Sequence, residues 1–277
     1  MNVRSIGLMM LGMLLIFSIP ASAQDSELLE GRGELEILLI HGLGSNAEVW
    51  DMLLPYLQGT FKVAVFEMSG HGKTQPVVDP TISSEVVRLE EFIKAQGFAY
   101  PTLVGHGMGG MIALEYSLKH PADVHRLIMM DAAPIQLASI DQKNEVGQQL
   151  INNYDRFIAG RYSLMSPLPD ISEQVVDSAL KTDSASFISM LMSSFDFDLT
   201  DQQPTLTVPL LVMGSELLFP HPDQSRAILN QIGFGKARAL SFKRLGKTGH
   251  FMMLERPVYT ASVLLAFGVK AEHVFDN

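Results

Sequence analysis

The sequence of 277 residues contains no cysteine. This absence excludes disulfide bonds, a thiol nucleophile and thiolate ligands for a metal, so that the fold depends on its core for stability. Charged residues are also scarce, at 18% of the chain against 47% hydrophobic residues. We therefore expect a globular chain with a sizeable core and not a disordered one.

Basic residues are fewer than acidic residues. Lys and Arg number 20 against 30 Asp and Glu, which gives a formal net charge of −10. An excess of negative charge disfavours binding to nucleic acid and to anionic membrane surfaces. We expect neither as a partner.

Long hydrophobic runs are absent except at the N-terminus. There, Arg4 precedes an apolar stretch from Ile6 to Ile19 and a small-residue site at Ala21, Ser22 and Ala23. These are the three parts of a secretory signal peptide, and they predict cleavage before Gln24 and export to the periplasm or the medium. An uncleaved N-terminal anchor is the alternative interpretation. After cleavage we expect no association with a membrane.

Six short apolar runs rich in β-branched residues are predicted to be strands. They are continuously apolar for the most part, as expected for parallel strands covered on both faces. The runs are Leu35 to His41, Phe61 to Met68, Pro101 to His106, Arg126 to Ala132, Pro209 to Ser215 and Ala239 to Leu245.

Stretches with helical spacing separate these strands, namely Ala47 to Gln58, Ser83 to Ala95, Met108 to Lys119, Pro222 to Gln231 and Pro257 to Phe267. The alternation predicts an α/β fold with a mostly parallel, doubly wound sheet. It is broken once, from Ile135 to Leu206, where amphipathic pieces rich in Met, Leu, Phe and Tyr predict a helical insertion over the strand ends. We therefore expect a core of residues 24–134 and 207–277, a cap of residues 135–206, and a signal peptide of residues 1–23.

The glycine loop "LVGHGMGG" admits two interpretations. Gly105, Gly107 and Gly110 spell the G-x-G-x-x-G of a dinucleotide-binding turn, with Asp131 about twenty residues further on for a ribose hydroxyl. With serine at position 107, the same loop would be the G-x-S-x-G elbow of a hydrolase. The loop follows the third predicted strand, whereas the dinucleotide fingerprint normally lies in the first βα unit.

Three further stretches favour the hydrolase interpretation. They are "LLIHGLGSNAEVW", "FEMSGHGKTQ" and "GKTGHFMMLERP", each at the end of a predicted strand. Together with the glycine loop, and in this order, they resemble the α/β-hydrolase fold family in its esterase, lactonase and peroxidase-like branch. The resemblance runs from about Glu34 to the C-terminus. Little chain precedes the first strand, so the antiparallel strands that usually open this fold are expected to be short or missing.

The resemblance assigns the nucleophile to position 107, where this chain has glycine and therefore no side-chain oxygen. It assigns the general base to His250, in a Gly-His-Phe turn after the last strand. His41, His71 and His106 also lie in the family's motifs. We expect these three to hydrogen-bond to the backbone and to shape turns.

The acid that would orient His250 is less clearly marked. The family has Asp after the strand "PLLVMG", where this chain reads "SELLFP". Glu216 keeps the family's four-residue spacing to Pro220 and is the predicted partner of His250. Asp131, after the preceding strand, is the reserve candidate.

The oxyanion hole of such enzymes is built from backbone N–H groups, which the resemblance assigns to Leu43 and Met108. Neither donor depends on a serine at position 107. Under the cap we expect a pocket for a small apolar ester, lactone or other carbonyl ligand, with Phe219, Phe251 and Met165 near it; the same side chains would equally suit a plain core. No cofactor and no metal are expected.

Three explanations fit Gly107. The nucleophile was removed by design, so that a ligand stays bound; or it was lost naturally, leaving a protein that binds without turnover; or a water takes the place of the hydroxyl and His250 activates it directly. An enzyme that lacks one member of its triad retains roughly 10³ to 10⁴-fold catalysis over water. In each case the chain is expected to be inactive or strongly impaired as a serine hydrolase.

Overall fold

A computed structural model describes residues 28–29, 33–136 and 138–269. The predicted signal peptide lies outside these residues. Within the described part of the chain, no helix is both long and apolar enough to cross a membrane.

The centre of the molecule is a seven-stranded sheet in the order β1-β3-β2-β4-β5-β6-β7. The strands β2 to β7 pair in parallel, whereas the two-residue β1 pairs antiparallel with β3. This confirms the predicted α/β-hydrolase fold. Among the described residues, the antiparallel part before β2 is the short strand β1. The strand bounds are β1 Leu28–Leu29, β2 Leu35–Ile40, β3 Phe61–Phe66, β4 Thr102–His106, β5 Arg126–Met130, β6 Leu210–Ser215 and β7 Leu240–Leu245.

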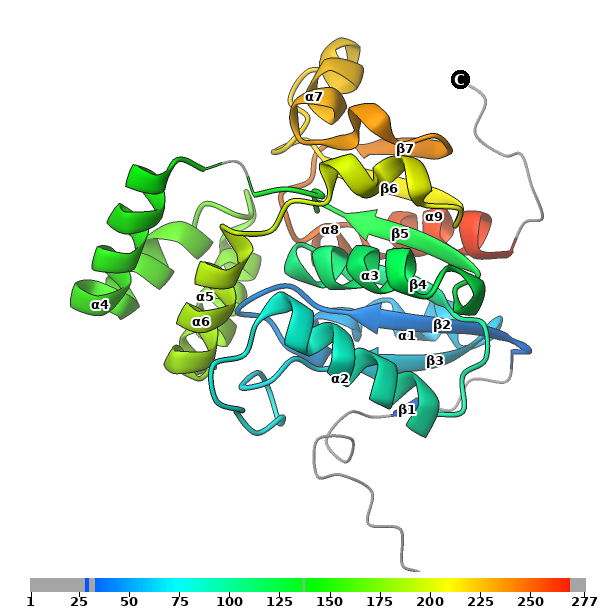
Figure 1. Cartoon of the computed structure of the whole chain (residues 1–277), viewed down its shortest axis with the longest axis horizontal. Helices are drawn as coiled ribbons and strands as arrows, with labels where there is room; N and C mark the ends of the chain where they lie inside the picture. Colours follow the sequence, from blue (N-terminus) through cyan, green and yellow to red (C-terminus); the bar gives the residue numbers. More distant parts are fainter. Residues whose placement is uncertain (1–27, 30–32, 137, 270–277) are drawn as a thin grey trace, which may run out of the picture.

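Helices cover both faces of the sheet (Figure 1). Because side chains alternate along a strand, Leu38 and Ile40 of β2 pack in one cluster with α2 and α3. Their neighbours Ile37 and Leu39 pack in the other cluster with α1, α8 and α9. The helices are α1 Leu54–Leu57, α2 Ile82–Ala95, α3 Met108–Lys119, α7 Ser225–Gln231, α8 Met252–Glu255 and α9 Pro257–Val269.

Two predicted helices are each broken in two, which corrects the sequence prediction. In place of one helix from Ala47 to Gln58 there is a 3-10 turn, η2 Ala47–Trp50, before α1, which has Pro55 in its first turn. A 3-10 turn, η5 Pro222–Gln224, likewise precedes α7. Proline lacks the N–H needed inside a helix but suits its first turn, so Pro55 favours a new start there.

Between β5 and β6 the chain forms a cap at the carboxyl ends of the strands (Figure 1). Asn153 adopts non-helical angles (φ −149°, ψ 49°) inside the longest cap helix, so residues 154–162 form a separate helical section. The bounds are α4 Ile140–Tyr162, α5 Pro169–Lys181, α6 Ser184–Ser194, and the 3-10 helix η4 Thr200–Thr205. Three further 3-10 pieces, η3 Pro121–Asp123, η5 and η6 Phe234–Lys236, lie in the core's connections.

Candidate active site

Gly107 occupies a sharp turn between β4 and α3. Its φ of 51° and ψ of −118° are disfavoured for a residue with a side chain, and its N–H donates to the Met130 carbonyl (2.9 Å). The flanking glycines allow close backbone approach. A Cβ on Gly109 would lie 2.3 Å from the Ile40 carbonyl oxygen, and one on Gly105 the same distance from the Gly109 oxygen. The turn thus has the geometry of a nucleophile elbow.

His250 faces this turn. A Cβ built on Gly107 would lie 3.3 Å from His250 Nε2, so a hydroxyl one bond further out would be within hydrogen-bonding reach. The other ring nitrogen, Nδ1, is 3.2 Å from Asp131 Oδ2. Because an ionised carboxylate only accepts, Nδ1 carries the proton in this pair and Nε2 is left as the acceptor toward position 107.

Asp131 is the carboxylate partner of His250. It follows β5, its side chain is only 2% exposed, and it accepts hydrogen bonds from the Ser215 N–H (2.7 Å) and the Ser215 hydroxyl (2.5 Å). Ser215 is the last residue of β6, the neighbouring strand. Two adjacent strand ends thus fix one carboxylate against the histidine.

The prediction of Glu216 as this partner is wrong. Its side chain is 48% exposed and accepts from the Lys247 N–H (2.7 Å) while pairing with Arg244 (3.2 Å). The Lys247 hydrogen bond, with the Arg244 charge, lowers the pKa of Glu216 from its ordinary value. Glu216 therefore stabilises the turn before His250 from the protein surface and does not contact the His250 ring.

The loop after β2 carries Leu43 and is fixed by buried histidines. His71 Nε2 accepts from the Gly44 N–H (3.1 Å), and His41 Nε2 accepts from the Met68 N–H (3.1 Å). Each ring then donates through Nδ1 to a nearby carbonyl. Burial lowers the pKa of His41 to about 4 and that of His71 to about 3, so both rings are neutral at neutral pH.

His106 has a similar structural role beside the reacting position. Its ring is fully buried, packs 4.3 Å from the His250 ring between centroids, and donates from Nε2 to the His250 carbonyl (3.0 Å). Burial, with the nearby His250, holds the pKa of His106 well below its ordinary value. The expectation that His41, His71 and His106 bind backbone is confirmed by these hydrogen bonds.

The cap holds both sides of the site. The Tyr162 hydroxyl donates to the Leu43 carbonyl (2.6 Å), and the His250 N–H donates to the Met165 carbonyl (2.7 Å). Burial raises the pKa of Tyr162, so that its hydroxyl stays protonated as a donor. Cap packing therefore positions the loop of Leu43 and the turn of His250.

A cavity of about 370 Å³ lies at this point, between the elbow and the cap. Leu43, Met108, Met165 and Phe251 line it together with Gly107, His250 and Asp131. The backbone groups expected to form an oxyanion hole therefore belong to residues that border the same cavity as the histidine. The rest of the lining is mostly apolar, including Met111, Ile135, Leu191, Leu217, Leu218 and Ile232.

Phe219 is not part of this cavity, which corrects the prediction. It is fully buried and packs against Phe242, with ring centroids 4.7 Å apart. A Cβ on Gly214 would lie 2.2 Å from its ring, so Gly214 leaves the space that Phe219 fills. Phe219 belongs to the core.

Two residues that matter here, Ser215 and Tyr162, were not identified from the sequence. Ser215 ends a predicted strand next to the expected acid, and this position was the available signal for it. Tyr162 lies in an amphipathic cap segment, where an aromatic residue is ordinarily read as core. Its contact with Leu43 spans 119 residues of chain, and no local pattern predicts such a contact.

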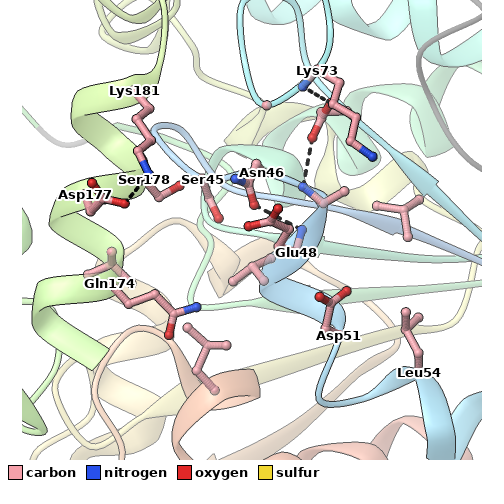
Figure 2. Close-up of a pocket in the computed structure, with 17 residues that line it drawn as sticks. Ser45, Asn46, Glu48, Asp51, Leu54, Lys73, Gln174, Asp177, Ser178 and Lys181 are labelled. Atoms are coloured by element: carbon pink, nitrogen blue, oxygen red, sulfur yellow. Dashed lines mark hydrogen bonds and ion pairs between the residues drawn. The ribbon is translucent and has the colours of Figure 1, made fainter. Parts of the chain in front are cut away.

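A second and larger cavity, of about 510 Å³, lies beyond the same loop (Figure 2). Ser45, Asn46 and Ala47 of the loop line it, and Asp177 and Lys181 of α5 form an ion pair at its wall. Glu67 at its base accepts from the Ala47 and Lys73 N–H groups. Neither Gly107 nor His250 borders it, so this cavity is separate from the candidate active site.

The geometry also bears on the dinucleotide interpretation. Asp131, which would have to meet a ribose hydroxyl, already binds Ser215 and His250. Gly105 and Gly109 are in close contact with protein backbone. The glycines are therefore explained by packing and by the elbow turn, which favours the hydrolase interpretation.

Comparison with known proteins agrees with this geometry. Residues 37–263 match the family model described as "Alpha/beta hydrolase family". Among curated proteins, the Karrikin insensitive 2 receptor IA of Petunia hybrida is 25% identical over 261 residues, covering 85% of this chain and 90% of the receptor.

Solved structures with the same fold include two named enzymes. An enol-lactonase from Burkholderia xenovorans superposes with a TM-score of 0.76 at 18% identity, covering 90% of this chain and 99% of the lactonase. A thermophilic esterase from Thermogutta terrifontis gives 0.75 at 20% identity, covering 87% and 92%. At these identities the likeness shows the fold alone.

Proposed function

This chain belongs to the alpha/beta hydrolase family, and we propose that it binds an apolar ester, lactone or other carbonyl ligand in a serine-hydrolase-type site whose nucleophile position is Gly107. The observation that carries the proposal is the juxtaposition of Gly107, His250 and Asp131. The base and its carboxylate partner lie as hydrolysis requires, and only the attacking oxygen is missing from the side chains.

The cavity supports a carbonyl ligand. Backbone N–H groups of Leu43 and Met108 are the proposed donors to the carbonyl oxygen, and Met108 begins α3, where N–H groups lack partners within the helix. The mostly apolar lining suits an apolar acyl or alcohol group. None of these groups depends on a side chain at position 107.

A role in ligand binding is consistent with the name of one relative. A curated protein similar to this chain over most of its length is named a receptor, whereas structures of the same fold include an esterase and a lactonase. The same fold therefore occurs in proteins named as receptors and in proteins named as enzymes. Gly107 favours binding over efficient hydrolysis here, whether it arose by design or naturally.

Replacing Gly107 by serine tests the proposal directly. We expect the Gly107→Ser variant to hydrolyse a short-chain p-nitrophenyl ester about 10³-fold faster than the parent, or more, because the triad is then complete. His250→Ala in each background is the matched control and should remove the gain. If serine gives no increase and no ester binds, the site is not an ester site and the proposal is wrong.

The same variant has a second expected property. Position 107 has a positive φ, and a Cβ there would lie in tight contact with His250. Serine should therefore lower the free energy of unfolding by about 1–3 kcal/mol. Denaturant unfolding of parent and variant measures the difference.

A second candidate function is slow hydrolysis by water. It is favoured by the orientation of His250, whose Nε2 faces position 107 and is left as an acceptor by the Asp131 contact. A water near Gly107 would then lose its proton to His250 as it attacks the carbonyl. A residual rate in the parent that disappears in His250→Ala would support this candidate; a residual rate that persists would exclude it.

Export through the N-terminal segment also stays a proposal. Fractionation of cells that express the full chain, together with the N-terminal sequence of the product, tests it. An N-terminus at Gln24 is expected, and an intact Met1 in the mature protein would contradict cleavage.

A further inference from the structure

A groove of about 740 Å³ continues from the candidate active site along α4. It shares Arg161, Met165 and Leu217 with the active-site cavity, and its other lining residues include Arg156 and Leu164. We call it the α4 groove. The two hollows therefore adjoin at Met165 and Leu217.

The α4 groove combines apolar and basic side chains. Leu164 and Leu217 are 77% and 56% exposed and give the groove apolar surface. Arg156 and Arg161 supply two positive charges, and no Asp or Glu lines the groove. This composition matches an aliphatic chain that carries a negative group.

Neither arginine side chain forms a hydrogen bond or an ion pair within the described part of the chain. Several other cations are paired with carboxylates, as Lys143 is with Asp196 and Lys236 with Asp201. Among the described residues, Arg226 and Arg238 also form no ion pair, but Arg156 and Arg161 line one groove together. Guanidinium groups bind carboxylates through paired hydrogen bonds.

We propose that the ligand of this site is an ester or lactone whose aliphatic chain ends in a carboxylate held by Arg156 and Arg161. The carbonyl lies between Gly107 and Leu43, the chain passes Met165 and Leu217, and the carboxylate reaches the α4 groove. This inference rests on the proposed function, since it places the carbonyl in the same site. It adds the class of ligand and the residues that select it.

Two esters of equal chain length separate the contribution of the terminal charge to binding from that of the aliphatic chain. Monomethyl suberate and methyl octanoate have the same methyl ester and the same six methylenes, and differ in a terminal carboxylate against a methyl group. Calorimetric titration of the full chain should show monomethyl suberate binding about tenfold tighter or more, an advantage that shrinks as salt is raised.

A double variant, Arg156→Gln with Arg161→Gln, should abolish this preference by weakening the binding of monomethyl suberate. Methyl octanoate, which has no carboxylate, measures any loss of binding that does not depend on charge. Both side chains are exposed, so the fold is expected to be intact. Arg238→Gln is the matched control, since Arg238 is an exposed arginine near the opposite end of β7 and outside both cavities.

The outcomes are distinct. Equal binding of the two esters by the parent, or a preference that survives in the double variant, overturns the role of the arginines while the proposed function stands. A preference lost equally in Arg238→Gln shows an effect of overall charge and also overturns it. If neither ester binds at all, the proposed function fails and this inference fails with it.

Discussion

Asp131 and Glu216 are acidic residues that follow neighbouring strands at the same edge of the sheet, yet their surroundings differ. Asp131 is buried and accepts hydrogen bonds from both the backbone and the hydroxyl of Ser215, and it contacts His250. Glu216 is half exposed and binds Lys247 and Arg244. The strand β5 therefore supplies the carboxylate partner of His250, which is Asp131. The acid was expected after β6, and β6 instead supplies Ser215, which binds Asp131.

The largest effect on the rate of hydrolysis that distinguishes the two acids is expected at Asp131. In the Gly107→Ser background, Asp131→Asn should lower the rate of ester hydrolysis by up to about 10⁴-fold, because an amide no longer fixes the proton on His250 Nδ1. Steady-state kinetics with a p-nitrophenyl ester measure it. Glu216→Gln is the matched control and should change the rate less than about twofold; the opposite ranking would reverse the assignment.

An intermediate effect is expected at Ser215. Ser215→Ala removes the hydroxyl donor to Asp131 but keeps the N–H donor, so in the same background the rate should fall about tenfold. The free energy of unfolding should fall by about 1–2 kcal/mol, because a buried carboxylate loses one hydrogen bond.

Ser241→Ala on β7 is a suitable control for this change, since Ser241 is a strand serine only partly buried and outside the site. A rate for Ser215→Ala equal to that of the parent variant would mean that the N–H alone fixes Asp131.

The smallest effect is expected for the stability of Glu216→Gln. The pKa of Glu216 is lowered in the folded state, chiefly by the Lys247 hydrogen bond, so its charge stabilises the fold above the ordinary pKa of Glu. That contribution is lost as pH falls through the lowered pKa. Thermal unfolding should show the variant melting within about 2 °C below the parent at pH 7, and the difference should shrink as pH falls below the ordinary pKa of Glu. A gap that does not change with pH would point to lost packing and not to charge.

The strands and the elbow could be predicted from the sequence because their signals are local. Continuous apolar runs mark strands that are buried on both faces, and glycines around position 107 mark close backbone approach. His250 was equally accessible, since its turn follows the last strand directly. In each case the residues that determine the structure lie within a few positions of one another.

The acid and one wall of the pocket could not be predicted because they depend on contacts between distant segments. Spacing along the chain selects Glu216, but Ser215, at the end of the strand next to Asp131, determines which carboxylate meets His250. Phe219 is apolar and follows a strand, as a pocket residue would be. Its place in the core follows from the room that Gly214 leaves for its ring and from contact with Phe242.

The turn at Gly107 has a consequence for the history of such a protein. Glycine adopts the elbow angles without the strain that serine would bear, so a change from serine to glycine here would be accompanied by a gain in stability. The opposite change would add an oxygen and lower the stability of the fold. Only selection for turnover itself would then favour serine at this position.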